Sequence, residues 1–107
     1  MSSNATAVAA PAIPAEVTAF AAEHGVSEYV APLLQMTLRA FPGAPLSVEV
    51  EEDAEEFDMR LIVFLIDVTG WDLDRLSAAD DEWVQGLMRI CPGPVRPLFT
   101  IGIWGSS

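Results

Sequence analysis

Residues 57–68, FDMRLIVFLIDV, decide the fold of this 107-residue chain. The stretch begins by alternating polar and apolar residues and then becomes an unbroken apolar block from Leu61 to Ile66. Alternation is typical of a strand with one solvated face, whereas a continuous β-branched and aromatic run is typical of a strand buried on both faces. Residues 57–68 are therefore predicted to form the central strand of a small sheet.

Two helices and a strand are predicted before this stretch. An apolar stripe indicates a short helix over residues 14–24. Apolar residues spaced by three and four indicate a second helix, which begins at a Ser27 cap or, because of Pro32, near Ala31. Polarity then alternates over residues 46–51, which predicts a strand that exposes its serine and its glutamates.

A third helix over residues 72–90 and a last strand over residues 98–104 are predicted after it. Asp72 or Thr69 can cap this helix, and Ser77 can break it. A strand, a crossover helix and a following strand usually form a parallel unit, so the last strand is expected beside the central one. The predicted class is α+β, in the order helix, helix, strand, strand, helix, strand. Residues 14–107 are predicted to form one domain, and residues 1–13 are predicted to form a disordered tail.

The pairing of the first two strands is predicted from a loop placed at residues 53–56. This loop pairs Val48 with Leu61 and sets Glu49 opposite Arg60. In this pairing, the residues of the central strand that face the core are Met59, Leu61, Val63 and Leu65. The pairing leaves Ile62, Phe64, Ile66 and Val68 on a second apolar face, which either the third helix or another protein is expected to cover.

Composition narrows the class of partner. The chain has sixteen acidic residues against five basic ones, all arginine, and a net charge of -11. This charge repels nucleic acid and anionic membranes and favours a basic protein partner, although the host's protein composition alone would also explain it. The single cysteine excludes an internal disulfide, and neither a signal peptide nor a membrane-spanning segment is predicted. A cytoplasmic location is expected.

Few residues suggest catalysis. His24 is expected at a helix end, and Cys91 is expected to be a buried small residue without a group that lowers its pKa. Asp67 ends the central strand, where binding groups often lie, but it can equally cap the turn at Thr69. Trp71, Trp83 and Trp104 could form a stacking platform, although Trp83 lies on the expected core stripe. The acidic loop lacks EF-hand spacing and is better explained as a solvated turn formed by Asp53, Glu55, Glu56 and Asp58.

A resemblance rests on three short motifs: Phe41-Pro42-Gly43-Ala44, Val48-Glu49-Val50 and Asp53-Ala54-Glu55. Together with the hydrophobic strand and the acidic helix, residues 27–90 resemble a group of small stand-alone bacterial proteins of uncharacterised function. Ala54 stands where that pattern has proline. The resemblance implies a small αβ accessory protein, one half of a two-gene module, and brings no catalytic residues.

These observations favour a small acidic protein that binds other proteins, as a homodimer or as half of a two-protein module with an antitoxin-like or immunity-like role. The alternatives are a metal-assisted enzyme that uses Asp67 and Asp72, and an inhibitor that mimics nucleic acid. No cofactor is expected. The predicted interface consists of Ile62, Phe64, Ile66, Val68 and Trp104. The predicted acidic surface consists of Asp72, Asp74, Asp80, Asp81 and Glu82.

Overall fold

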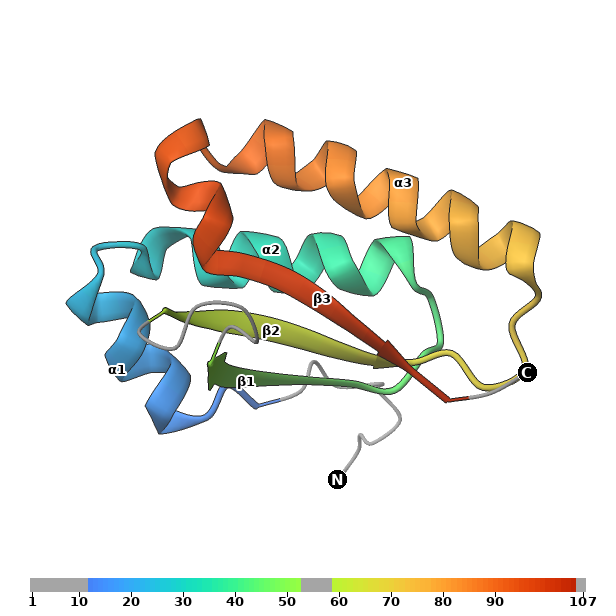
Figure 1. Ribbon diagram of the computed structural model, residues 1–107, viewed down its shortest axis with the longest axis horizontal. Coiled ribbons are helices and arrows are strands. Elements are labelled where there is room, and N and C mark those ends of the chain that lie inside the picture. The colour runs from blue at the N-terminus through green and yellow to red at the C-terminus, as the bar shows by residue number, and fades with distance from the viewer. Residues whose placement is uncertain (1–11, 53–58, 106–107) are drawn as a thin grey trace, which may run out of the picture.

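The computed structural model describes residues 12–52 and 59–105. Most of the predicted tail, the acidic loop and the first two residues of the predicted central strand lie outside the described residues. The order helix, helix, strand, strand, helix, strand is confirmed, and so is the α+β class (Figure 1). The elements are α1 (Ala15–Glu23), α2 (Ser27–Ala40), β1 (Leu46–Glu52), β2 (Arg60–Asp67), α3 (Leu73–Ile90), the 3-10 helix η2 (Gly93–Leu98) and β3 (Phe99–Trp104).

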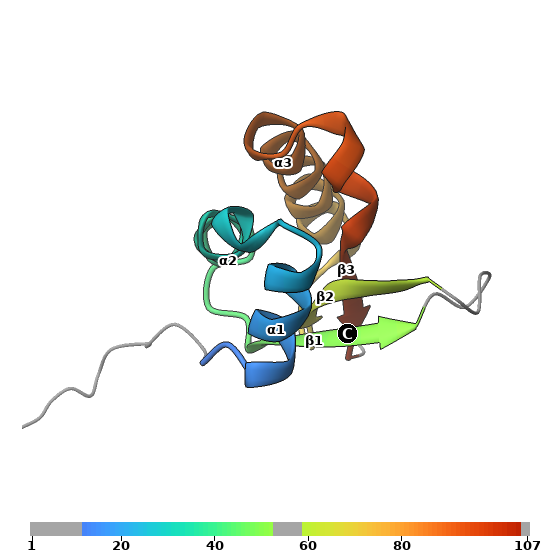
Figure 2. The same ribbon diagram turned by 90° about the vertical axis from the view of Figure 1, so that its left-hand side faces the viewer.

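The three strands form one mixed sheet in the order β1-β2-β3. β1 and β2 are antiparallel, whereas β3 is parallel to β2, as the crossover through α3 predicts. Figure 2 shows α2 and α3 on one side of the sheet and α1 next to β1. The predicted central position of β2 is therefore confirmed.

The helix termini follow local chemistry. The Asp72 Oδ1 atom accepts a hydrogen bond from the Arg75 N–H at 2.7 Å, so Asp72 caps α3 and Thr69 does not. α3 continues through Ser77 without a break. α2 includes Ser27 as its first residue and Pro32 within it, so the prediction of Ser27 as the cap is wrong. Val26 occupies the cap position, where its buried apolar side chain makes no capping hydrogen bond.

The predicted pairing of β1 with β2 is wrong by three residues. Val48 lies opposite Phe64, and Val50 lies opposite Ile62. A shift by an odd number turns every side chain of β2 to the other face. The helices therefore cover Ile62, Phe64 and Ile66, each with no exposed surface, and these residues belong to the hydrophobic core.

The physical reason for this error lies in the apolar block of β2. Both faces of the block are hydrophobic, so burial alone does not select a register, and a loop placed at residues 53–56 leads to the wrong one. The polarity of the strand end carries the missing signal. The set that contains Ile62 stays apolar through Val68, whereas the set that contains Leu65 ends in Asp67 and Thr69. If this second set faced the helices, the Asp67 carboxylate would point toward an apolar layer, which is unfavourable for a charged group.

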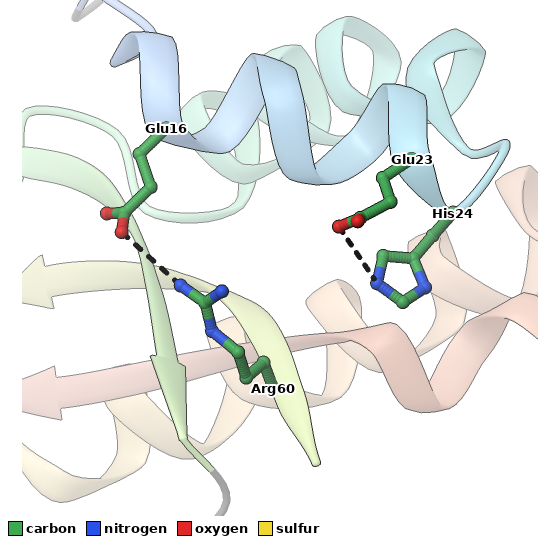
Figure 3. Close-up of polar contacts among 4 residues, drawn as sticks. All are labelled: Glu16, Glu23, His24 and Arg60. Atoms are coloured by element: carbon green, nitrogen blue, oxygen red, sulfur yellow. Dashed lines mark hydrogen bonds and ion pairs between the residues drawn. The ribbon is translucent and has the colours of Figure 1, made fainter. Parts of the chain in front are cut away.

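Arg60 illustrates the consequence for charge. It was predicted to lie opposite Glu49, but in the structure it lies opposite Glu52 and points toward α1. Its Nη2 atom is 3.3 Å from Glu16 Oε2 (Figure 3). Its guanidinium carbon lies 5.7 Å from the centre of the Phe20 ring. Arg60 thus links the start of β2 to α1, and the predicted pair with Glu49 does not form.

A short hydrogen-bond chain joins α2 to α3 inside the core. The Trp83 indole N–H donates to the Thr37 hydroxyl at 2.8 Å, and this hydroxyl donates to the Leu33 carbonyl at 2.7 Å. Thr37 is fully buried and Trp83 nearly so. The indole also lies 6.5 Å from the Phe64 ring, between centroids. Trp83 is therefore a core residue, as predicted, and both polar groups are satisfied.

Candidate functional site

The face of the sheet opposite the helices is the main candidate site. It is called the uncovered face here and consists of Ser47, Glu49 and Glu51 of β1, Leu61, Val63, Leu65 and Asp67 of β2, and Thr100, Gly102 and Trp104 of β3. Side chains that lie side by side in these registers share a face. In the described part of the chain, no helix crosses this face (Figure 2). It therefore leaves an apolar strand open on one side.

The uncovered face contains a broad shallow depression of about 500 Å³. Leu61, Val63 and Leu65 line it from β2, and Gly102 lines it from β3. A Cβ atom at Gly102 would lie 2.7 Å from Leu65 Cδ2, so the absence of a side chain there lets Leu65 lie across β3. Val63 is buried by its neighbours although it is not part of the helix-side core. The result is a smooth apolar floor rather than a deep pocket.

Carboxylates lie along one side of this floor. Glu49 is opposite Val63, Glu51 is opposite Leu61, and both glutamates are exposed. No arginine lies on the uncovered face. Arg60 points to α1, and Arg96 of η2 donates to the carbonyls of residues 88 and 91. The remaining arginines lie on α2 and α3. The face therefore combines an apolar centre with negative charge.

Asp67 occupies the end of this face and forms a turn. Its Oδ1 atom accepts hydrogen bonds from the Thr69 hydroxyl at 2.6 Å and from the Thr69 N–H at 2.9 Å. These bonds, the hydroxyl first, hold the pKa of Asp67 below its usual value of 3.8. Asp67 thus has a local structural role, which is the simpler of the two roles that its position suggested.

We expect Thr69→Ala to raise the pKa of Asp67 toward 3.8, because the stronger of the two bonds to the carboxylate is lost. Because the pKa of Asp67 is lower in the folded state, the ionised carboxylate stabilises the fold at pH values above 3.8. This stabilisation is lost as the pH falls through the lowered pKa. The measurement is an NMR titration of the Asp67 carboxyl carbon in both proteins. An identical titration in the wild type and the variant would contradict this assignment.

Most of the predicted interface is not available to a partner. Ile62, Phe64, Ile66 and Val68 pack under the helices with at most 5% of their surface exposed. The prediction that these four side chains form the interface is wrong, because the register turns them inward. Trp104 is different, since 54% of its surface is exposed and it lies on the uncovered face beside Asp67. Sequence reasoning missed Leu61, Val63 and Leu65, which it had assigned to the core.

The predicted acidic surface lies along α3. All five of its residues are exposed, and one of them, Asp72, also caps the helix. The three tryptophans do not form a platform: Trp83 is in the core, and Trp71 packs between Phe41 and Arg75. The Phe41 and Trp71 ring centroids are 5.6 Å apart, and the Arg75 guanidinium carbon lies 3.7 Å from the Trp71 ring centre. This stacking explains Trp71 as part of the fold.

The residues considered for catalysis have structural surroundings. His24 ends α1, with its ring centroid 4.2 Å from that of Phe20 and its Nε2 atom 3.9 Å from Glu23 Oε1 (Figure 3). Cys91 is buried as predicted, and burial raises the pKa of its thiol. The expectation that no neighbouring group lowers this pKa is wrong, because the Arg96 guanidinium offsets the effect of burial in part. Within residues 12–52 and 59–105, no three potential metal ligands come together. The helices of that same part include none that is long and apolar enough to cross a membrane.

The uncovered face thus combines a flat apolar floor, flanking carboxylates and an exposed tryptophan. A metal-assisted reaction was considered for Asp67 and Asp72. The Asp67 carboxylate accepts hydrogen bonds within a turn, and the Asp72 carboxylate caps a helix. Comparison of the chain with protein-family models, with curated proteins and with solved structures found no match.

Proposed function

We propose that this protein is a small acidic cytoplasmic protein that binds a basic protein partner through its uncovered face, as one half of a two-protein module. The observation that carries the proposal is the sheet itself. One face is packed under α2 and α3, and the other presents the half-buried Leu61 and Leu65 beside exposed glutamates. The expected occupant is a cationic amphipathic helix of the partner.

The apolar floor supports affinity. Fully burying a leucine or valine side chain is worth about 1.5 to 3 kcal/mol. Leu61 and Leu65 are half-buried and retain part of that amount, whereas Val63 is already buried and contributes little further. Trp104 is more than half exposed and adds a large aromatic surface at the end of the floor. An amphipathic helix can cover a flat floor of this kind with its apolar stripe.

The carboxylates support the choice of a basic partner. Glu49 and Glu51 lie next to the floor, and the chain carries a net charge of -11. Opposite charge on a partner raises the association rate and selects against acidic competitors. Lysines beside the apolar stripe of a helix would lie against these glutamates. The acidic surface of α3 adds to the attraction at longer range.

The experiment is a titration of the methyl-labelled protein with a designed Leu/Lys peptide of helical apolar period, followed by NMR. We expect the largest shifts in the methyl groups of Leu61, Val63 and Leu65. A peptide with Glu in place of Lys is the matched probe, and we expect it not to bind. Shifts confined to α3 would contradict the assignment of the uncovered face as the binding site.

Charge variants test the electrostatic part separately. The double variant Glu49→Gln/Glu51→Gln is expected to weaken binding of the Leu/Lys peptide by about tenfold, because two close charges are lost. The control Asp80→Asn/Asp81→Asn removes the same charge from α3 and is expected to have a smaller effect. Equal weakening by the two double variants would show that only net charge matters.

A further inference from the structure

β3 is an edge strand of the sheet, and its end is exposed. The sheet order β1-β2-β3 gives β3 only one neighbouring strand in the described part of the chain. Near its end, Ile103 and Trp104 expose 40% and 54% of their surface. Native edge strands usually carry charges, prolines or bulges that prevent pairing with another chain. The sequence of β3, FTIGIW, contains no charged residue and no proline.

The backbone groups at this edge can be assigned from the sheet pairing. The Trp104 carbonyl accepts a hydrogen bond from the Val68 N–H at 2.9 Å, so the backbone of Trp104 points toward β2. Backbone groups alternate sides along a strand, so those of Thr100 and Gly102 also point toward β2. The N–H and C=O groups of Ile101 and Ile103 therefore point to the free edge. They are available for a further strand.

We propose that the occupant of this edge is β3 of a second copy, which pairs antiparallel across a twofold axis. Charge favours a second copy at this edge alone. The other edge, β1, carries Glu49, Glu51 and Glu52, and pairing two such strands would oppose carboxylates. β3 has no charged residue, so two chains of net charge -11 can meet along it without such opposition.

The strand is also complementary to itself. With Gly102 on the twofold axis, Ile101 of each copy lies opposite Ile103 of the other, and their outward backbone groups bond in both directions. The isoleucines share the helix-side face and form apolar cross-strand pairs, which are favourable. Gly102 then faces its own copy at the closely spaced position of the antiparallel pair. The result is a continuous six-stranded sheet.

The dimer and the binding of a basic partner are separate properties. The dimer leaves each uncovered face open and joins the two into one continuous surface. Salt distinguishes the two properties, because carboxylates farther apart than the screening length, about 10 Å at 0.1 M, no longer repel in added salt. Dimerisation is therefore expected to strengthen with salt, whereas binding of the Leu/Lys peptide is expected to weaken.

The test is light scattering on the full chain over a micromolar concentration series, in low and in high salt. The wild type is expected to approach twice its monomer mass of 11.5 kDa. Ile103→Lys places a charge at the edge and is expected to stay monomeric. The control Ala22→Lys adds the same charge on α1, next to the opposite edge, and is expected to dimerise like the wild type. A wild type that stays monomeric in both salts, or an Ile103→Lys variant that dimerises, overturns the proposal.

Amide hydrogen exchange on the wild type gives a second readout that needs no variant. The Ile101 and Ile103 amides are expected to exchange quickly in dilute protein and slowly in concentrated protein, because the second copy bonds them. The Gly102 amide, which bonds β2, is expected to be protected at both concentrations. A dimer in which the Ile101 and Ile103 amides stay unprotected would place the contact elsewhere and overturn the proposal.

Discussion

Ile66→Ala is expected to lower the free energy of unfolding by about 2 to 5 kcal/mol, and Leu65→Ala by only about 1 kcal/mol. The two residues are adjacent in β2 and have side chains of the same volume, and the higher strand propensity of isoleucine accounts for less than about 1 kcal/mol of the expected difference. Ile66 has no exposed surface and packs under the helices, whereas Leu65 lies half-buried on the uncovered face. The difference between the two variants therefore reports which face of β2 the helices cover.

The measurement is urea unfolding of both variants and the wild type, with the slope of the transition compared among the three. Total stability of a domain of this size is about 5 to 15 kcal/mol, so Ile66→Ala can remove a large share of it. Ile66→Val, with an expected loss of about 0.5 to 1.5 kcal/mol, is the milder companion if the alanine variant does not fold. A Leu65→Ala loss as large as that of Ile66→Ala would show that the register is wrong.

Thr37→Val is expected to lower the free energy of unfolding by about 1 to 3 kcal/mol. Valine has nearly the shape of threonine but leaves the buried Trp83 indole N–H without its acceptor. Thr37→Ser retains the hydroxyl and is expected to keep the hydrogen bond, with a smaller loss from the missing methyl group. The contrast separates the hydrogen bond from the packing of the side chain.

A double-mutant cycle with Trp83→Phe completes this test. Trp83→Phe removes the donor, so the further change Thr37→Val no longer strands a polar group and is expected to cause little additional loss. Unfolding by urea, followed by circular dichroism, serves all four proteins because one of them lacks the indole. Strictly additive losses would contradict the bond between α2 and α3.

Much of the fold follows from local sequence chemistry. The 3.6-residue spacing of apolar residues locates α1, α2 and α3, and alternation locates β1. Asp72 caps α3, as an aspartate directly before a helix commonly does. The chain connection through α3 also correctly predicts that β3 lies beside β2. These features depend on residues close together in the chain, where propensity and capping act directly.

The pairing of the strands depends on more distant residues and was not predicted. Two apolar faces on β2 made two registers comparably hydrophobic, and only the polar end of the strand at Asp67 separates them. The predicted site was wrong for the same reason. The prediction assigned Leu61, Val63 and Leu65 to the core and Ile62, Phe64 and Ile66 to the other face, whereas the structure has the reverse. Trp104 kept its place on an exposed surface because its position depends on β3 rather than on the β1 register.

The central claim is that the sheet has one face packed under helices and one face open to a partner. Methyl NMR with a soluble paramagnetic agent tests it most directly, in dilute protein without a peptide. The account predicts strong broadening of the Leu61 and Leu65 methyl groups and little change in those of Ile62 and Ile66. Broadening of Ile62 and Ile66 with protection of Leu61 and Leu65 would contradict it, because the face assigned to the partner would then be the core.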